Sequence, residues 1–210
     1  MTRPGRLIVF EGPDGVGKST LVECGANFLK ERGVSFLSVS FPGKDPGTLG
    51  WLVDRIHHKQ QGIDLIGLSE LSLQALHIAA HLDHIETRVQ PALRNGTHVI
   101  LDRFWWSAWV YGRASNVETE VLDLLIDAEK RAWVPTTPGH VFLVNRTIPF
   151  RAEHNDERYS RLSALYEDLA SREGKRYAVT TISNDKIGES AGWVREKLEE
   201  LLEPGNRQSI

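Results

Sequence analysis

Residues 12–19 form a run whose residue types are suited to holding phosphate. The run reads Gly-Pro-Asp-Gly-Val-Gly-Lys-Ser and fits the pattern G-x-x-x-x-G-K-[ST] without a mismatch. Its glycines allow backbone angles that other residues resist, and they let amide groups approach phosphate closely. Lys18 would reach the β- and γ-phosphates of a nucleoside triphosphate, and the Ser19 hydroxyl would ligate Mg²⁺. The predicted nucleotide-binding residues are Gly12, Pro13, Gly15, Val16, Gly17, Lys18, Ser19 and Thr20.

Asp102 and Arg103 form a second candidate pair, at the end of a short apolar run. A carboxylate at this position can hold Mg²⁺ directly or through water, so we expect Asp102 to share the metal with Ser19. The guanidinium of Arg103 can clamp a phosphate with two parallel hydrogen bonds. The alternative is an ion pair on the surface at the end of a strand.

Apolar runs alternate with amphipathic stretches along the whole chain. We expect strands at 7–10, 34–41, 99–101, 141–144 and 177–182, and helices near 18–32, 48–59, 68–93, 104–112, 118–133, 156–172 and 191–202. Short apolar strands separated by helices predict an α/β fold: a P-loop NTPase-like, parallel five-stranded sheet with helices on both faces. Ligands bind beyond the carboxyl ends of such strands. The loops after Phe10, Ser40, Leu101 and Val144 should therefore border the site.

The composition is that of an ordinary globular protein, with 210 residues, 25% charged residues and a net charge of −3. This near-balance argues against a general nucleic-acid binder. The single cysteine excludes an internal disulfide framework. No apolar run reaches the roughly 18 residues that a membrane span needs. We expect one domain over residues 1–210, with 204–210 as a flexible tail, in the cytoplasm.

Three stretches together resemble the thymidylate kinase family. They are residues 10–20, the run Phe41-Pro42-Gly43, and Asp102-Arg103-Phe104 followed by Ser107 and Tyr111. The resemblance implies Mg²⁺-dependent phosphoryl transfer from ATP to a nucleotide, with dTMP to dTDP as the leading reaction. It also implies that the protein forms a homodimer.

The resemblance assigns roles to individual residues. It places Asp14 beside the reacting phosphates and the acceptor sugar, and it gives Arg103 the acceptor phosphate. Tyr111 would lie under the deoxyribose, and Ser107 would lie near the base. Phe41 and Pro42 would shape the acceptor pocket.

The acceptor pocket departs from the family pattern at three positions. Ser40 stands where the family has a phosphate-binding arginine. His77 and His81 stand where the family has an aromatic that stacks on thymine and an arginine that hydrogen-bonds it. Because they are four residues apart, the two histidines share one helix face. His77 can still stack, and His81 can still donate a hydrogen bond, in a pocket that is pH-sensitive near neutrality. The alternatives are a metal pair and a solvated or partly buried helix face without a role.

The lid expected of the family is shortened here to residues 144–157. Family members carry a catalytic arginine in either the phosphate loop or the lid, and the loop position is Gly15 in this chain. Arg146, Arg151 and Arg158 are the candidates to replace it, and we assign the catalytic role to Arg151. Spacing alone leaves open which of the three acts.

Other features leave the acceptor open. Trp105, Trp106 and Trp109 would pack in the core, pack in a dimer interface, or form a stacking platform for a base in single-stranded DNA. Because of Ser40, His77, His81 and the short lid, the alternative acceptors to dTMP are a modified pyrimidine nucleotide, a nucleoside or a hydroxymethylated base in DNA. A nucleotide-binding protein with weak catalysis is the other alternative. DNA is not the favoured partner, and we expect no membrane partner.

Overall fold

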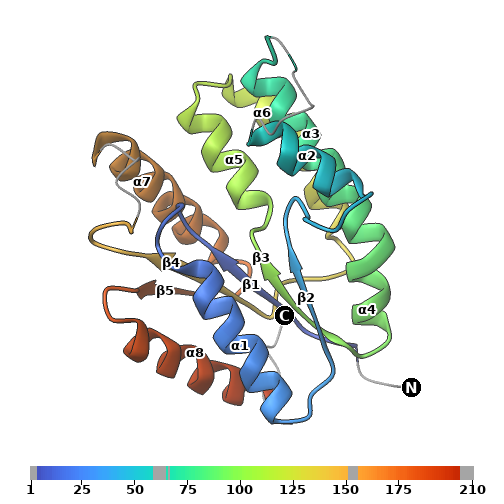
Figure 1. Ribbon diagram of the computed structural model, residues 1–210, viewed down its shortest axis with the longest axis vertical. Helices are drawn as coiled ribbons and strands as arrows, with labels where there is room; N and C mark the ends of the chain where they lie inside the picture. The colour runs from blue at the N-terminus through green and yellow to red at the C-terminus, as the bar shows by residue number, and fades with distance from the viewer. Residues whose placement is uncertain (1–3, 59–64, 66, 151–155, 204–210) are drawn as a thin grey trace.

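Five parallel strands form the central sheet of the computed structural model (Figure 1), which describes residues 4–58, 65, 67–150 and 156–203. The sheet order is β2-β3-β1-β4-β5. The strands are β1 Leu7–Glu11, β2 Phe36–Ser40, β3 His98–Asp102, β4 His140–Asn145 and β5 Val179–Ser183. Nearly every residue of β1, β3 and β4 is buried, because both faces of the sheet are covered. The predicted α/β fold is confirmed.

Helices α1 (Lys18–Glu31) and α8 (Ile187–Leu202) cover one face of the sheet, where Ile8, Phe10 and Ile100 join a core with them. The other face carries the larger core, built on Val9 and Leu101. Helices on that side, with α2 packed against α3, are α2 Leu49–His57, α3 Glu70–His84, α4 Gln90–Arg94, α5 Trp105–Ala114, α6 Thr119–Ala132 and α7 Asp156–Glu173. None of the helices within the described residues could span a membrane.

The predicted helix over 68–93 is not regular throughout. A π-helical turn, η1, occupies Ile85–Val89 between α3 and α4. Pro91 lies in the first turn of α4 and has no N–H for the carbonyl four residues earlier. A π-turn accommodates such a break. Apolar periodicity does not reveal it, since the buried residues Ile85 and Val89 still fall on one face.

The three tryptophans of α5 lie in the core. Trp106 has no exposed surface, and its indole N–H donates to the Tyr177 hydroxyl at 3.0 Å. The Trp109 indole donates to Asp123 at 2.8 Å. Because Trp105 is also buried, the interpretation as a DNA-stacking platform is wrong, and the interpretation as core packing is confirmed.

Strand register brings the candidate residues to one edge of the sheet. Phe10 pairs with Asp102 in β1 and β3, and Ser40 pairs with Asp102 in β2 and β3. The loops that follow these strands therefore begin side by side. This is the edge at which ligands bind in parallel sheets.

Candidate functional site

The phosphate loop connects β1 to α1 in a conformation that only glycine tolerates at its first position. Gly12 has φ 139°, and a Cβ there would lie 2.0 Å from the Val144 carbonyl oxygen. The residue preceding α1, Gly17, provides no side-chain cap. The first amide groups of α1 are thus left for an anion.

Lys18 folds back over this loop. Its ammonium donates to the carbonyl oxygens of Gly12 and Pro13 at 2.8 Å and 2.6 Å. Burial, followed by the charge of Arg103, lowers the pKa of Lys18 to about 8. The lysine is thus a buried cation, held beside the place where phosphate would lie.

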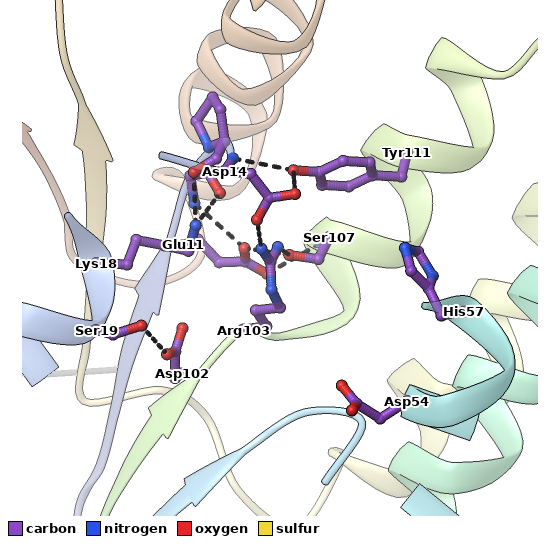
Figure 2. Close-up of polar contacts among 12 residues, drawn as sticks. Glu11, Asp14, Lys18, Ser19, Asp54, His57, Asp102, Arg103, Ser107 and Tyr111 are labelled. Atoms are coloured by element: carbon purple, nitrogen blue, oxygen red, sulfur yellow. Dashed lines mark hydrogen bonds and ion pairs between the residues drawn. The ribbon is translucent and has the colours of Figure 1, made fainter. Parts of the chain in front are cut away.

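Ser19 and Asp102, which are predicted to share Mg²⁺, lie within hydrogen-bonding distance of each other. The Ser19 hydroxyl donates to Asp102 Oδ2 at 3.2 Å (Figure 2). The other oxygen, Asp102 Oδ1, is buried, and no described residue donates a hydrogen bond to it. An unpartnered carboxylate oxygen beside a hydroxyl suits Mg²⁺, which binds proteins through one or two oxygens and substrate phosphates. The residues present fit the ion.

Asp14 of the phosphate loop forms a network with Arg103 and Tyr111 (Figure 2). Arg103 pairs with Asp14 Oδ1, and the Tyr111 hydroxyl donates to Asp14 Oδ2 at 2.7 Å. The Arg103 guanidinium also lies 5.6 Å from the Tyr111 ring centroid. Burial, reinforced by Asp14, raises the pKa of Tyr111 well above its ordinary value. The structure therefore brings these three residues together from two segments of the chain, and their roles toward a substrate stay predictions.

Glu11 is a buried positioning residue whose role sequence reasoning missed. It has no exposed surface, and its Oε1 accepts the amide N–H groups of Phe104 at 2.7 Å and Ser107 at 3.0 Å. Its Oε2 accepts the Ser107 hydroxyl at 2.7 Å. Glu11 thus caps α5, the helix that carries Ser107 and Tyr111, because the residue preceding that helix, Phe104, has no capping side chain.

Removal of this cap should destabilise the protein. Glu11→Ala leaves buried donors unpaired, and we expect it to lower the free energy of unfolding by about 3 kcal/mol. Glu11→Gln retains an acceptor oxygen and should lose less. Urea unfolding would measure both, with Glu23→Ala, an exposed glutamate on α1, as the control. Wild-type stability in Glu11→Ala would contradict the capping role.

A cavity of about 420 Å³ opens between the phosphate loop and helices α2, α3 and α5. Among the residues that line it are the predicted Asp14, Gly15, Gly17, Lys18, Ser19, Thr20, Phe41, Pro42, His77, His81, Asp102, Arg103, Ser107 and Tyr111, and also Ser40, Lys44, Asp54, His57 and Gln74. His57 and Asp54, both on α2, were not predicted and lie on the far side of this space from Lys18 (Figure 2). In the sequence, Asp54 and His57 lie in a stretch that indicates only an amphipathic helix, so nothing there points to a binding role.

Both predicted histidines line this cavity. His77 lies within hydrogen-bonding distance of His57, with 3.0 Å between Nε2 and Nδ1. Burial lowers the pKa of His77 well below 6.5, so this ring is neutral at pH 7. The expected pH sensitivity near neutrality is therefore wrong for His77. His81 is 2% exposed and His77 is partly buried, so the pair does not lie on a solvated face, and a partly buried face without a role stays an alternative. Within the described part of the chain, no three His, Cys, Asp or Glu residues cluster as metal ligands.

Phe41 and Pro42, which are predicted to shape the acceptor pocket, line the cavity. The peptide bond between them is cis. The Phe41 ring stacks on His81, with centroids 4.2 Å apart and planes 17° apart. The turn after β2 therefore packs against the ring face of His81.

The segment after β4 packs against the phosphate loop. The Phe150 amide donates to the Gly15 carbonyl at 2.8 Å. Arg146 is engaged elsewhere, because it donates to the carbonyls of Ile148 and Asn184 and stacks on Phe150. Arg158 is exposed on α7. Arg151 lies outside the described residues, as do the rest of 151–155 within the predicted lid and the predicted tail 204–210.

Comparison with known proteins agrees with this geometry. The thymidylate kinase family model matches residues 10–184. A thymidylate kinase of Afipia carboxidovorans is 35% identical over 216 residues, which cover 95% of this chain and 89% of the relative. One of Dinoroseobacter shibae is 36% identical over 145 residues, covering 69% and 66% respectively. A crystal structure of thymidylate kinase from Ehrlichia chaffeensis has TM-score 0.68 and 26% identity, covering 95% of this chain and 99% of that one. The chain belongs to the thymidylate kinase family.

Proposed function

We propose that the protein transfers the γ-phosphoryl group of ATP to dTMP, forming dTDP, with Mg²⁺. The observation that carries this proposal is the shared cavity: the phosphate loop and the Asp14–Arg103–Tyr111 network line the same space. A phosphate donor and a phosphate acceptor can therefore meet there. The thymidylate kinases to which the chain is similar support dTMP as the acceptor.

The proposed chemistry relies on positioning and on charge. The attacking oxygen belongs to a phosphate that is already ionised, so little base catalysis is needed. Lys18 would exchange the carbonyls of Gly12 and Pro13 for the β- and γ-phosphates. Mg²⁺, bound by Ser19 and Asp102, would neutralise charge on the donor phosphates.

The acceptor side would be held by Arg103. Its guanidinium pairs with Asp14 in the structure and would turn its donors to the acceptor phosphate. Tyr111 would pack under the sugar, and Phe41 and Pro42 would bound the pocket. The Ser107 hydroxyl is occupied by Glu11 and by Arg103 at 2.9 Å, so we assign Ser107 to positioning Arg103 instead of contacting the base.

An acceptor panel tests the proposal. ADP release would be measured with Mg·ATP and dTMP, dUMP, dCMP, dGMP, thymidine or hydroxymethyluracil-containing DNA. The expected result is the highest kcat/KM on dTMP. Turnover confined to another acceptor would replace dTMP as substrate, and ATP binding without turnover would favour the weakly catalytic alternative.

We propose that Arg151 supplies the catalytic arginine, since its chain neighbour Phe150 is bonded to the phosphate loop while Arg146 is engaged elsewhere. Arg151→Ala should lower kcat by about 10³-fold, as for other arginine fingers. Steady-state kinetics of Arg151→Ala, Arg146→Ala and Arg158→Ala would test the choice. A larger loss in either of the other two variants would reassign the role.

We further infer that residues 1–210 form a single domain, because the strands of one sheet run from Leu7 to Ser183.

We also propose that the protein forms a homodimer. Exposed leucines on three neighbouring helices, Leu52 of α2, Leu71 of α3 and Leu124 of α6, would suit its interface. Because the reaction draws on ATP, we place it in the cytoplasm.

A further inference from the structure

A buried carboxylate on α6 holds the histidine that lines the acceptor cavity. Glu129 has no exposed surface, and its Oε2 lies 2.9 Å from Nδ1 of His81 on α3. Its other oxygen, Oε1, accepts the Trp133 indole N–H at 3.2 Å. Both oxygens of the carboxylate are thus assigned to different partners. Such complete pairing is what a buried carboxylate requires.

This pairing sets the proton position on His81. A carboxylate has no proton to donate, so the imidazole must present Nδ1–H to Glu129. In a neutral imidazole the second nitrogen, Nε2, is then a hydrogen-bond acceptor. Among the described residues Nε2 has no assigned partner, and His81 lines the acceptor cavity. Stacking on Phe41 holds the ring in this orientation.

The neighbouring histidines do not change which nitrogen of His81 donates and which accepts. Burial lowers the pKa of both His57 and His77, which bond to each other through Nδ1 and Nε2. The rings of His57 on α2 and His77 on α3, which both line the cavity, are therefore neutral at pH 7. A neutral wall that presents an acceptor selects a ligand edge that carries a donor.

We propose that Glu129 is a positioning residue for base selection: by fixing the proton of His81 on Nδ1, it makes Nε2 the acceptor for the N3–H of a 4-oxo pyrimidine. Thymine and uracil carry a proton on N3, whereas N3 of cytosine is an acceptor and would face the Nε2 lone pair. This inference rests on the proposed function. It extends that function by naming the atom that separates dTMP from dCMP.

Glu129→Gln tests the inference with little change of shape. Trp133 would hold the amide oxygen, so the amide NH₂ would face Nδ1 of His81 and move the proton to Nε2. Nε2 would then be a donor aimed at N3–H. We expect kcat/KM for dTMP to fall about tenfold, mainly through KM, and the dTMP-to-dCMP ratio to fall with it. N3-methyl-dTMP, which lacks the donor, should be a correspondingly poor substrate of the wild type.

A second substitution and a spectroscopic signal separate this role from a merely structural one. Trp133→Phe added to Glu129→Gln frees the amide to rotate, which should restore part of the dTMP preference. Glu120→Gln, an exposed change on the same helix, is the control. Imidazole ¹⁵N NMR would read which nitrogens of His81 carry a proton. We expect Nδ1–H on His81 in the wild type and Nε2–H in Glu129→Gln.

Each outcome has one meaning. An Nε2–H tautomer in the wild type, or an unchanged dTMP-to-dCMP ratio in Glu129→Gln, would overturn the inference while leaving dTMP phosphorylation intact. A wild type that turns over no dTMP would refute the proposed function, and this inference with it.

Discussion

Lys18→Ala should lower kcat/KM for ATP by about 10³-fold, the effect of removing a preorganised charge from a reacting centre. The ammonium of Lys18 is buried and held by two loop carbonyls, so it loses no further solvation when it turns to phosphate. Lys44 is the other lysine among the described residues that line the cavity. Steady-state kinetics and ATP titration would measure the loss.

The control for this variant is Lys30→Ala, an exposed lysine on the same helix, which should behave as the wild type. The pKa of Lys18, lowered to about 8 by burial, adds a pH test. The protonated form binds phosphate, so kcat/KM for ATP in the wild type should fall as pH rises above about 8. Activity of Lys18→Ala within tenfold of the wild type would contradict the assignment.

Arg103→Ala should raise the acceptor KM and lower kcat/KM for dTMP by about 10²-fold, the loss of two charge-assisted hydrogen bonds. The KM for ATP should change little, because Lys18 and the loop amides hold the donor. Arg103 has φ 74°, in the left-handed region, and its backbone N–H donates to the Phe10 carbonyl at 2.9 Å. The backbone thus aims the side chain at Asp14 and the cavity.

Arg103→Lys keeps the charge but loses the planar pair of donors, so its kcat/KM should lie between those of Arg103→Ala and the wild type. Removal of the guanidinium also takes a cationic partner from Asp14, which keeps its hydrogen bond from Tyr111. Thermal unfolding of both variants would show whether the fold survives. An acceptor KM equal to the wild-type value would refute the role of Arg103.

The fold could be predicted because its signals are local. Strands such as β1 and β4 read as apolar runs, and the phosphate loop needs only neighbouring residues to be recognised. Parallel pairing then brings Asp102 beside Phe10, so the proximity of Asp102 to Ser19 follows from topology. The π-turn at Ile85–Val89 escaped prediction because it preserves the apolar face.

The rest of the site could not be predicted, because it depends on packing between helices distant in the sequence. Glu129 lies 48 residues from His81, and His57 lies 20 residues from His77. An acidic residue on an amphipathic helix is usually on the solvated face, and only the packing of α6 on α3 shows that Glu129 is buried. Glu11 adjoins the phosphate loop, but its partners lie on α5.

The central claim is tested most directly by identifying the product. Wild-type protein and Lys18→Ala would each be incubated with Mg·ATP and dTMP, and ³¹P NMR would follow the reaction. We predict that the wild type forms ADP and dTDP in equal amounts and that Lys18→Ala forms neither at a comparable rate. ADP with inorganic phosphate and unchanged dTMP would show an ATPase instead, and would contradict transfer to the nucleotide.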